Sequence, residues 1–456
     1  MNPRWVVVKF GGTSVASPRA LRRAAAVVAN AYREQRVAVV VSALAGVTSA
    51  LDAAASRSTR GQGVASAVVG RLRRQHRRLL HVVARSEARD AALALEPVLQ
   101  GLRRRLEHAT RTRSLTSWLR AEVLAAGERL SVHVFAAVLR ERGVPAAASD
   151  ATHWLVASGE PLEAEPDPAA TRERTANVLP TIWGVPVITG FIAGSVAGSA
   201  APPPNGGGAS QTAARAEHEP ATVLLGRGGS DLSATLLAAA LDAERVEIFT
   251  DTHGVRTADP RLVPHSRVHR TLTPTLASRL ARLGAKVLHP RTLEPLLALR
   301  IPLLVRDTFH LERAGTTIAF GTPARPAEFE NGRGSQTTGP VRTLASVVSG
   351  ASLVRVGSDA GTAPARLAAL LRAHEVPVLR SLLDDSLLMP ATALACVRAT
   401  GVHGLRFTPG PFDGRLVAVV SAHQAVSPEF VGRALAAAGV FPLAPPARAL
   451  PGVTAA

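Results

Sequence analysis

Cysteine is almost absent from this chain of 456 residues. Cys396 stands alone, so it can form neither an internal disulfide nor a cysteine-based metal cluster. Long apolar runs are missing too, because no stretch approaches the ~18–20 apolar residues that a membrane-spanning helix needs. The apolar start of the chain meets Lys9 at once, without the segment typical of a signal peptide. We therefore expect a cytoplasmic protein in a reducing compartment.

Aromatic residues are also scarce, at 4%, which leaves few side chains on which nucleic acid bases can stack. The net charge of +19 alone is compatible with nucleic acid binding, and five arginines lie within residues 71–78. However, Leu72, Leu79, Leu80 and Val83 have the spacing of a helix around them. A solvated helix face is the simpler interpretation, and we expect neither a nucleic acid nor a membrane partner.

Lysine is the third scarce residue. Of the 53 basic residues, only Lys9 and Lys286 are lysines, and the others are arginines. A compact ammonium group fits between phosphate oxygens where a wide, planar guanidinium does not. The alternative explanation is that the two lysines occur by chance in a chain whose other basic residues are arginines. We take both positions as candidates for contact with phosphate.

Strands alternate with helices over roughly the first 320 residues. The apolar patterns predict strands at 5–10, 37–41, 186–189, 223–225, 245–250 and 301–305. They predict helices at 18–35, 231–241 and 274–283 and an almost wholly helical region at 50–142. This alternation predicts an α/β fold in residues 1–320, with a doubly wound, mostly parallel sheet.

Three further segments complete the predicted organisation. Residues 194–220 form a low-complexity insert that we expect to be a mobile loop, and 321–344 have the composition of a linker. Residues 345–447 are expected to form a smaller α+β domain with a weak strand–helix–strand repeat. Its expected strands are 352–356, 377–382, 415–421 and 440–443, and its expected helices are 364–374 and 428–438.

Glycine-rich turns follow two of the predicted strands and are the first candidate sites. They read K-F-G-G-T-S at 9–14 and G-R-G-G-S-D at 226–231. A strand that runs through glycines into a helix leaves backbone N–H groups free to face an anion. The first turn is not a Walker loop, because its lysine precedes the glycines. A turn without a ligand is the plain alternative, and Asp231 has the further alternative of capping its helix.

Two more candidates lie further along the chain. Thr250 ends a predicted parallel strand and Asp251 follows it, at the edge where such sheets bind ligands, although an ordinary turn at 259–260 is the alternative. The stretch G-A-K-V-L-H-P at 284–290 holds the second lysine, and His289 before Pro290 is better explained as a structural hydrogen-bonding residue. No group of His, Cys and carboxylate residues has metal-ligand spacing in the sequence.

Seven blocks of this sequence resemble, in order, the motifs of aspartate kinases in the amino-acid kinase superfamily. They are K-F-G-G-T-S-V at 9–15, V-S-A-L-A-G-V-T at 41–48, G-E-R-L-S at 127–131, T-G-F-I at 189–192, G-R-G-G-S-D at 226–231, T-D-T-H-G-V-R-T-A-D-P-R at 250–261 and G-A-K-V-L-H-P at 284–290. One such match is weak, but seven in family order are specific. Residues 345–447 resemble, faintly, the paired ACT domains of that family.

The resemblance implies an enzyme that moves the γ-phosphoryl group of MgATP onto the side-chain carboxylate of L-aspartate, the first step towards lysine, threonine and methionine. The implied catalytic residues are Lys9, Asp231 and Lys286. The implied ATP-binding residues are Lys9, Gly11, Gly12, Thr13, Ser14, Thr250, Asp251, Arg256, Arg261, Lys286 and Val287. The implied aspartate-binding residues are Thr48, Glu128, Phe191, Arg227 and Ser230. Mg²⁺ is expected to bind mainly through ATP oxygens, without a dedicated set of protein ligands.

Some features depart from the family pattern and keep alternatives open. Leu232 stands where the family has an aromatic residue, and Arg256 stands near a family tyrosine, where its guanidinium can stack on adenine. A homodimer or higher homo-oligomer and an amino-acid effector are further expectations from the resemblance. The alternatives are a related kinase for another acidic acceptor, or a catalytically weak paralogue that senses amino acids.

Overall fold

The computed structural model describes residues 4–61, 63–195, 220–256, 266–282 and 288–320, together with seven strands between 345 and 455. The chain divides into two compact units. The first holds residues 1–253 and 291–317, and the second holds 254–290 and 318–456. None of the described helices combines the length and the apolar character needed to cross a bilayer.

A parallel sheet forms the centre of the first unit. Its strands are β1 (Trp5–Phe10), β2 (Arg36–Val41), β3 (Ala146–Ser149), β6 (Val185–Thr189), β9 (Arg245–Thr250), β11 (Leu303–Asp307) and β12 (Thr316–Ile318). They are ordered β12-β11-β9-β1-β2-β6-β3. All pairs from β11 to β3 are parallel, so their carboxyl ends lie at one edge of the sheet. The apolar runs of β1 and β2 are buried on both faces, as a covered parallel sheet requires.

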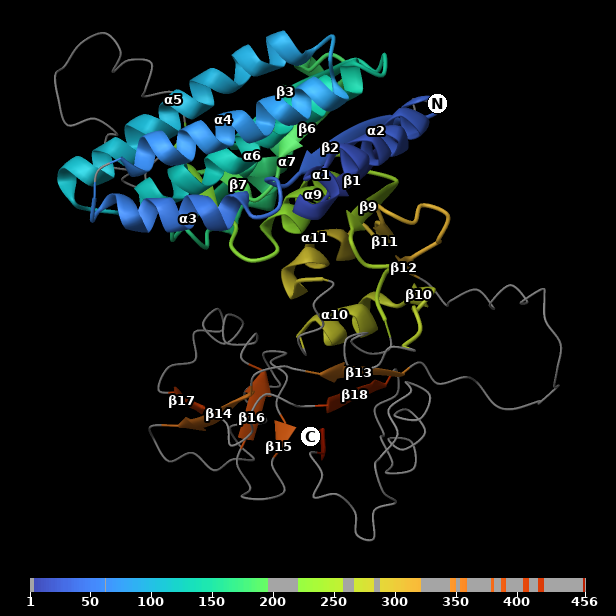
Figure 1. Cartoon of the computed structure of the whole chain (residues 1–456). Coiled ribbons are helices and arrows are strands. Elements are labelled where there is room, and N and C mark those ends of the chain that lie inside the picture. Colours follow the sequence, from blue (N-terminus) through green and yellow to red (C-terminus); the bar gives the residue numbers. More distant parts are fainter. Residues whose placement is uncertain are drawn as a thin grey trace. The chain divides into compact units, whose positions relative to one another are not determined.

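Helices follow the strands, as expected for a doubly wound fold (Figure 1). They are α1 (Gly12–Val15), α2 (Pro18–Tyr32), α3 (Val47–Ser58), α4 (Val64–Val83), α5 (Ala88–Thr112), α6 (Ser117–Arg140), α7 (Pro168–Val178), α9 (Gly229–Ala240) and α11 (Glu294–Leu297), with 3-10 turns at Ala151–His153, Leu179–Thr181 and Pro290–Thr292. One group, α2 with α3 to α6, packs together beside β2 and β6, whereas α9 packs with α7 and α11 beside β1.

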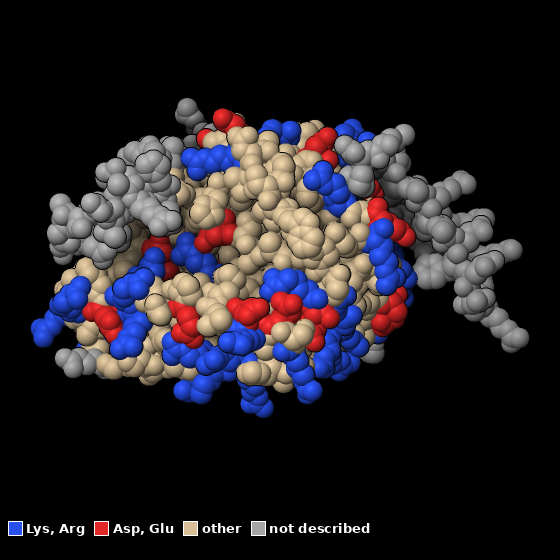
Figure 2. Space-filling model, turned by 90° about the horizontal axis from the view of Figure 1, so that it is seen from above, with Lys and Arg blue, Asp and Glu red and all other residues tan. Residues whose placement is uncertain are grey.

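The four helices α3 to α6 fill the region predicted to be helical, and α4 confirms the interpretation of its arginines. Leu72, Leu79 and Leu80 are buried, whereas Arg71 and Arg74 are exposed. Figure 2 shows basic and acidic side chains interspersed on the face that it presents. Helices α4 and α5 are joined by the ion pair Arg73–Glu96, and α5 also holds the pair Arg103–Glu107.

A smaller sheet in the first unit has the order β5-β4-β7-β8. Its strands are β4 (Val156–Ser158), β5 (Glu165–Pro166), β7 (Ile192–Ser195) and β8 (Thr222–Leu224). Its extent corrects one prediction. Gly194 and Ser195, expected to open the low-complexity insert, belong to β7, because Gly194 pairs with Thr222 of β8 and Ser195 donates its N–H to Ala221. Residues 196–219 of the insert lie outside the described residues.

The second unit contains α10 (Pro274–Arg282) and β10 (Thr271–Leu272). Of its later strands, β13 (Ala345–Ser349) pairs with β18 (Val417–Ser421), and a second sheet has the order β17-β14-β16-β15-β19. The latter comprises β14 (Leu353–Ser358), β15 (Leu379–Arg380), β16 (Leu387–Pro390), β17 (Leu405–Pro409) and β19 (Thr454–Ala455). The linker 321–344, the helices expected at 364–374 and 428–438 and the strand expected at 440–443 lie outside the described residues.

Candidate active site

The first glycine turn packs tightly against the ends of the neighbouring strands. Gly11 donates its backbone N–H to the carbonyl of Phe249 at 3.1 Å, next to the end of β9. A Cβ on Gly12 would lie 2.8 Å from the carbonyl oxygen of Ala43, just after β2. Only glycine allows this approach. The sequence pattern predicted a turn here, and the structure adds the single helical turn α1 directly after it.

Lys9 and Asp231 meet at this turn although they lie far apart in the sequence. Lys9 is only 8% exposed, and its Nζ lies 2.5 Å from Oδ1 of Asp231. Asp231 stands in the first turn of α9, whose N-cap is Gly228 with a left-handed φ of 71°. The ammonium also lies next to Gly11, at 3.6 Å from the position that a Cβ there would take. A buried cation, a glycine turn and a helix N-terminus therefore share one place, which suits an anionic ligand.

Glu128 lies on α6, where that helix touches the residues after β2. A Cβ on Gly127 would lie 2.8 Å from the Cβ of Ala43, so glycine brings the helix close enough for Oε1 of Glu128 to accept the Ala43 N–H at 3.2 Å. The other oxygen, Oε2, is buried and has no hydrogen-bond partner among the described residues. Burial raises the pKa of Glu128 to about 8, although the Ala43 N–H lowers it. A cationic ligand beside the unpartnered Oε2 would favour the ionised form of this carboxyl group.

The turn after β6 meets the N-terminus of α9. A Cβ on Gly190 would lie 2.7 Å from the Cβ of Ser230. Phe191 has a left-handed φ of 71°, and its N–H donates to Oγ of Ser233 at 3.0 Å. A non-glycine residue in this conformation is uncommon and costs on the order of 1–3 kcal/mol, which the surrounding contacts must offset.

Replacing Gly190 with alanine is expected to destabilise the protein by about 1–3 kcal/mol, because the added methyl group overlaps Ser230. Urea unfolding measures the loss. Gly70→Ala in α4 is the matched control. A methyl group there meets only the flexible end of Arg74, so the change should raise stability by about 0.5–1 kcal/mol through helix propensity. Equal effects of the two substitutions would contradict the close contact at Gly190.

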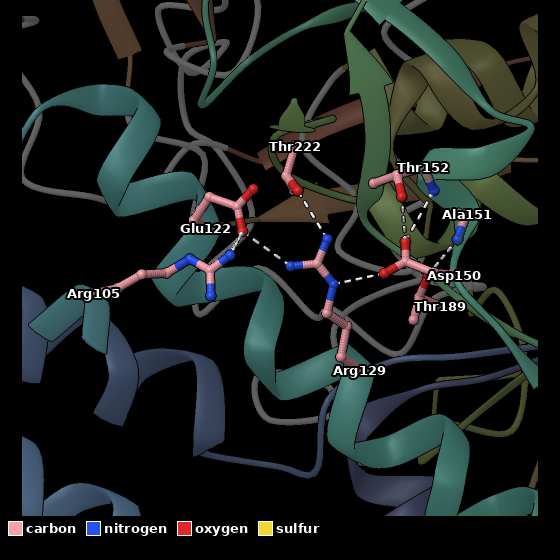
Figure 3. A network of polar contacts seen from close by, with 8 residues as sticks. All are labelled: Arg105, Glu122, Arg129, Asp150, Ala151, Thr152, Thr189 and Thr222. Carbon is pink, nitrogen blue, oxygen red and sulfur yellow. Dashed lines mark hydrogen bonds and ion pairs between the residues drawn. The ribbon is translucent and has the colours of Figure 1, made fainter. Parts of the chain in front are cut away.

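A network of charges holds α6 in place beside Glu128 (Figure 3). Arg129 donates to Asp150 at 2.6 Å, to Glu122 at 3.1 Å and to Thr222 of β8 at 2.8 Å. Arg105 of α5 also contacts Glu122, at 2.9 Å. Burial opposes the charge of Arg129, yet Asp150 and Glu122 hold the pKa of its guanidinium above the usual value. The network therefore joins α6 to α5, to β8 and to the end of β3.

The other predicted residues of the first unit have varied surroundings. Thr13 and Arg227 are exposed, and Thr48 is half-buried in the first turn of α3. The Ser14 hydroxyl is buried and lies 2.6 Å from that of Thr308, so it is engaged within the protein. Thr250 donates to Asp251 at 3.3 Å, beyond the end of β9. Six of the predicted residues in this unit are linked by contacts. Lys9 lies against Gly11 and Asp231, which follows Ser230 in α9, and Gly12 and Glu128 both contact Ala43.

The remaining predicted residues belong to the second unit. Arg256 donates to Oγ of Ser266 at 2.9 Å and also to the Ser266 carbonyl, and it forms an isolated bridge with Val268. Arg261, Lys286 and Val287 lie outside the described residues. That Lys9 and Lys286 both contact the phosphates of ATP therefore stays a prediction.

One group of polar side chains was not predicted from the sequence. His253 follows β9, whereas Asp307 ends β11 and His310 comes shortly afterwards, and the structure places all three side chains together. Local spacing cannot reveal such a group, because His253 lies far from the other two in the chain. Their shared position at the carboxyl ends of two paired strands is the signal that could have found them.

A model of the amino acid kinase family matches residues 4–307, so the chain belongs to that family. Within it, the aspartokinases are the group that this chain resembles. It is 33% identical to lysine-sensitive aspartokinase 3 of Escherichia coli over 339 residues, which make up 70% of this chain and 65% of that protein. It is 32% identical to a bifunctional aspartokinase/homoserine dehydrogenase of Haemophilus influenzae over 320 residues, which make up 68% of this chain and 36% of that one.

The solved structures agree with the sequence relatives. Escherichia coli aspartokinase III in complex with aspartate and ADP, in its R-state, superposes with a TM-score of 0.64 and 26% identity, over 91% of this chain and 85% of that one. The T-state of the same enzyme, in complex with lysine and aspartate, gives a TM-score of 0.63. The predicted amino-acid kinase fold is thereby confirmed. The chain spans about a third to two thirds of the length of the curated relatives described above.

Proposed function

We propose that this protein is an aspartate kinase, which transfers the γ-phosphoryl group of MgATP to the β-carboxylate of L-aspartate and forms 4-phospho-L-aspartate. The observation that carries the proposal is the buried Glu128, whose Oε2 lacks a hydrogen-bond partner among the described residues. Its Oε1 accepts from Ala43, and the Ala43 carbonyl abuts Gly12 of the turn beside Lys9. A site for an ammonium group thus adjoins a site for phosphate.

In this proposal the acceptor is held by charges that match its own. The α-ammonium group of aspartate binds to Glu128, and one carboxylate is bound bidentately by Arg227, with Thr48, Phe191 and Ser230 forming the rest of the pocket. The nucleotide binds along Gly11 to Ser14 and beside Thr250, Asp251, Arg256, Arg261 and Val287. The likeness to an aspartokinase that holds aspartate and ADP supports this arrangement.

The chemistry requires no general base. The side chain of aspartate is ionised at pH 7, so it is already a nucleophile. The difficulty is the approach of this anion to a triphosphate, which cations at the phosphates reduce. Lys9 and Lys286 supply these charges, and Mg²⁺ arrives as part of the MgATP substrate. Asp231 holds the Lys9 ammonium in position through their 2.5 Å contact. In-line positioning of the two anions supplies the rest.

Trapping of the acyl phosphate tests the proposal directly. With MgATP, L-aspartate and hydroxylamine, the full chain should form aspartyl hydroxamate in step with ADP release. L-glutamate and N-acetyl-L-aspartate are the matched acceptors, the first longer by one methylene and the second without an ammonium group. If the protein turns over another acidic acceptor in preference to aspartate, that acceptor would replace aspartate as the proposed substrate. Aspartate binding without any ADP release would instead indicate an amino-acid sensor.

The buried carboxyl of Glu128 predicts a pH dependence. Its pKa is about 8 in the free protein, and only the ionised form attracts an ammonium group. The KM for aspartate should therefore fall as the pH rises towards 8. Glu128→Gln should remove this dependence and raise KM by roughly 10²-fold, about 2–3 kcal/mol. Initial rates between pH 6 and 9 measure both effects, with Glu107→Gln on the exposed side of α5 as control.

The raised pKa of Glu128 also affects stability, but there a rise in pH is unfavourable. Because the folded pKa lies above the unfolded value of about 4.3, the folded state retains a proton that the unfolded state releases. Without aspartate, wild-type stability should therefore fall relative to Glu128→Gln as the pH rises from about 4.3 to about 8. A constant difference between the two proteins over this range would argue against a buried, proton-binding Glu128.

The proposal extends to regulation, assembly and location. Residues 345–447 are proposed to form an ACT-like region for an amino-acid effector and for homodimer or higher assembly, supported by the antiparallel β13–β18 and β14–β16 pairs. An effect of lysine or threonine on the rate of hydroxamate formation tests the effector. A cytoplasmic location is proposed from the single cysteine.

A further inference from the structure

Two histidines and one aspartate form a compact cluster beside the end of β11. The side chains of His253, Asp307 and His310 each offer a ligand atom, and these atoms all lie within 4.8 Å of one another. Nδ1 of His310 lies 2.9 Å from Oδ2 of Asp307, and Nδ1 of His253 contacts the same oxygen. The two imidazole rings are 4.7 Å apart and meet edge to face. Two imidazole nitrogens thus converge on one carboxylate oxygen.

Two paired strands of the parallel sheet position this cluster. Asp307 is the last residue of β11 and lies opposite Thr250, the last residue of β9. The next residue, Thr308, donates its N–H to the Thr250 carbonyl at 3.0 Å and extends the pairing beyond the strands. His253 follows β9 and His310 follows β11. Asp307 is therefore held by a strand of the sheet, and His253 and His310 stand shortly after the ends of two paired strands.

Asp307 is fixed in the manner of a metal-ligating carboxylate. It is 2% exposed, and its Oδ1 accepts the Phe309 N–H at 2.7 Å, which leaves Oδ2 to the histidines. Its orientation by a backbone donor is the kind of support that ligating carboxylates have.

The histidines show a further feature of a ligand set. Nδ1 of His253 is buried and is directed at Oδ2 of Asp307, the oxygen that Nδ1 of His310 also contacts. Two imidazole nitrogens directed at one carboxylate oxygen exceed what a single hydrogen-bonded pair needs. The side chains of His253 and His310 are 26% and 45% exposed, so water can reach the cluster from one side.

We propose that His253, Asp307 and His310 bind one divalent transition-metal ion of the Zn²⁺ type, through the two Nδ1 atoms and Oδ2, with water completing the coordination. Imidazole donors favour Zn²⁺ and similar ions over Mg²⁺ and Ca²⁺, which prefer oxygen donors. Three protein ligands with a position open to water are a common zinc arrangement. The bound ion would join the residues after β9 to those after β11, independently of the Mg²⁺ that accompanies ATP.

Metal binding to the full chain tests the proposal without reference to activity. Zn²⁺ is titrated by calorimetry into metal-free protein, and Co²⁺ replaces it to give an absorption spectrum that reports its ligands. One ion per chain should bind at this cluster, and the thermal unfolding midpoint should rise with Zn²⁺. Asp307→Asn and His310→Ala should each weaken this binding at least about 10-fold and change the Co²⁺ spectrum.

His81→Ala is the matched control, because His81 is an exposed histidine of α4 far from the cluster in sequence. It should leave the affinity and the spectrum unchanged. His310 is the more exposed of the two histidines in the cluster, so its variant reports on the metal even if Asp307→Asn unfolds. Unchanged Zn²⁺ affinity in His310→Ala, or an equal loss in His81→Ala, would overturn the proposal.

Discussion

Replacing Lys9 with methionine is expected to lower kcat/KM for phosphoryl transfer by roughly 10²–10³-fold, or about 2.7–4 kcal/mol of transition-state stabilisation. Lys9 is buried next to the glycine turn, and its ammonium is fixed by Asp231 at 2.5 Å. A cation held in a site with little water stabilises developing phosphate charge more than a mobile one does. ADP release at saturating and at limiting ATP separates the effect on kcat from that on KM.

Lys9→Arg distinguishes the charge from its shape. Arginine retains the positive charge and a partner for Asp231, but its wider planar head fits poorly between phosphate oxygens, so most activity should still be lost. Arg103→Met, in an exposed pair on α5, is the control and should have wild-type kinetics. A Lys9→Met enzyme with a rate within about threefold of the wild type would exclude the proposed role of this residue.

Replacing Arg129 with methionine is expected to destabilise the first unit by about 3–5 kcal/mol, because it leaves the buried Asp150 without its arginine and leaves Glu122 with Arg105 in place of two arginines. Burial opposes the ionisation of both carboxyl groups, but Arg129 keeps the pKa of each below its usual value. Removal of the guanidinium removes that compensation. Urea unfolding followed by tryptophan fluorescence measures the change, because Trp154 is fully buried and lies close to Asp150 in the sequence.

Arg103→Met again supplies the comparison, now for stability. Arg103 and Glu107 are exposed and stand about one helical turn apart on α5. Loss of their ion pair should therefore change the free energy of unfolding by no more than about 0.5 kcal/mol. Effects of similar size at the two arginines would show that the network in Figure 3 adds nothing beyond a surface ion pair.

Strongly patterned elements were predictable from the sequence. The bounds of β1 and β9 agree with the predicted strands at 5–10 and 245–250, because β1 is a mostly apolar run and β9 places Val246, Ile248 and Phe249 among polar residues. By contrast, β3 consists of Ala146, Ala147, Ala148 and Ser149, which have little preference for strands. Its pairing with β6 decides its conformation, and this is a tertiary interaction. The helix α7 was missed for a related reason, since only Thr171 and Thr175 of its residues are buried.

The candidate site was predictable where it consists of local motifs. Each glycine turn could be recognised within a few residues, and parallel pairing then brings the strand ends to one edge. The precise contacts depend on residues that no local motif joins. The unpartnered oxygen of Glu128 depends on Gly127 and Ala43, and the histidine–aspartate cluster depends on the pairing of β9 with β11. Neither the environment of Glu128 nor the histidine–aspartate cluster can be predicted from the spacing of residues in the sequence.

The unpartnered oxygen of Glu128 also bears on selectivity between acids of similar size. Succinate has both carboxylates of aspartate but no amino group, so its binding would leave the buried Oε2 of Glu128 without a partner. Sites built around a buried polar group commonly reject an analogue that lacks the matching group by about 10⁴-fold. A dicarboxylic acid without nitrogen would thus be a poor competitor, even in a cell where such acids are abundant.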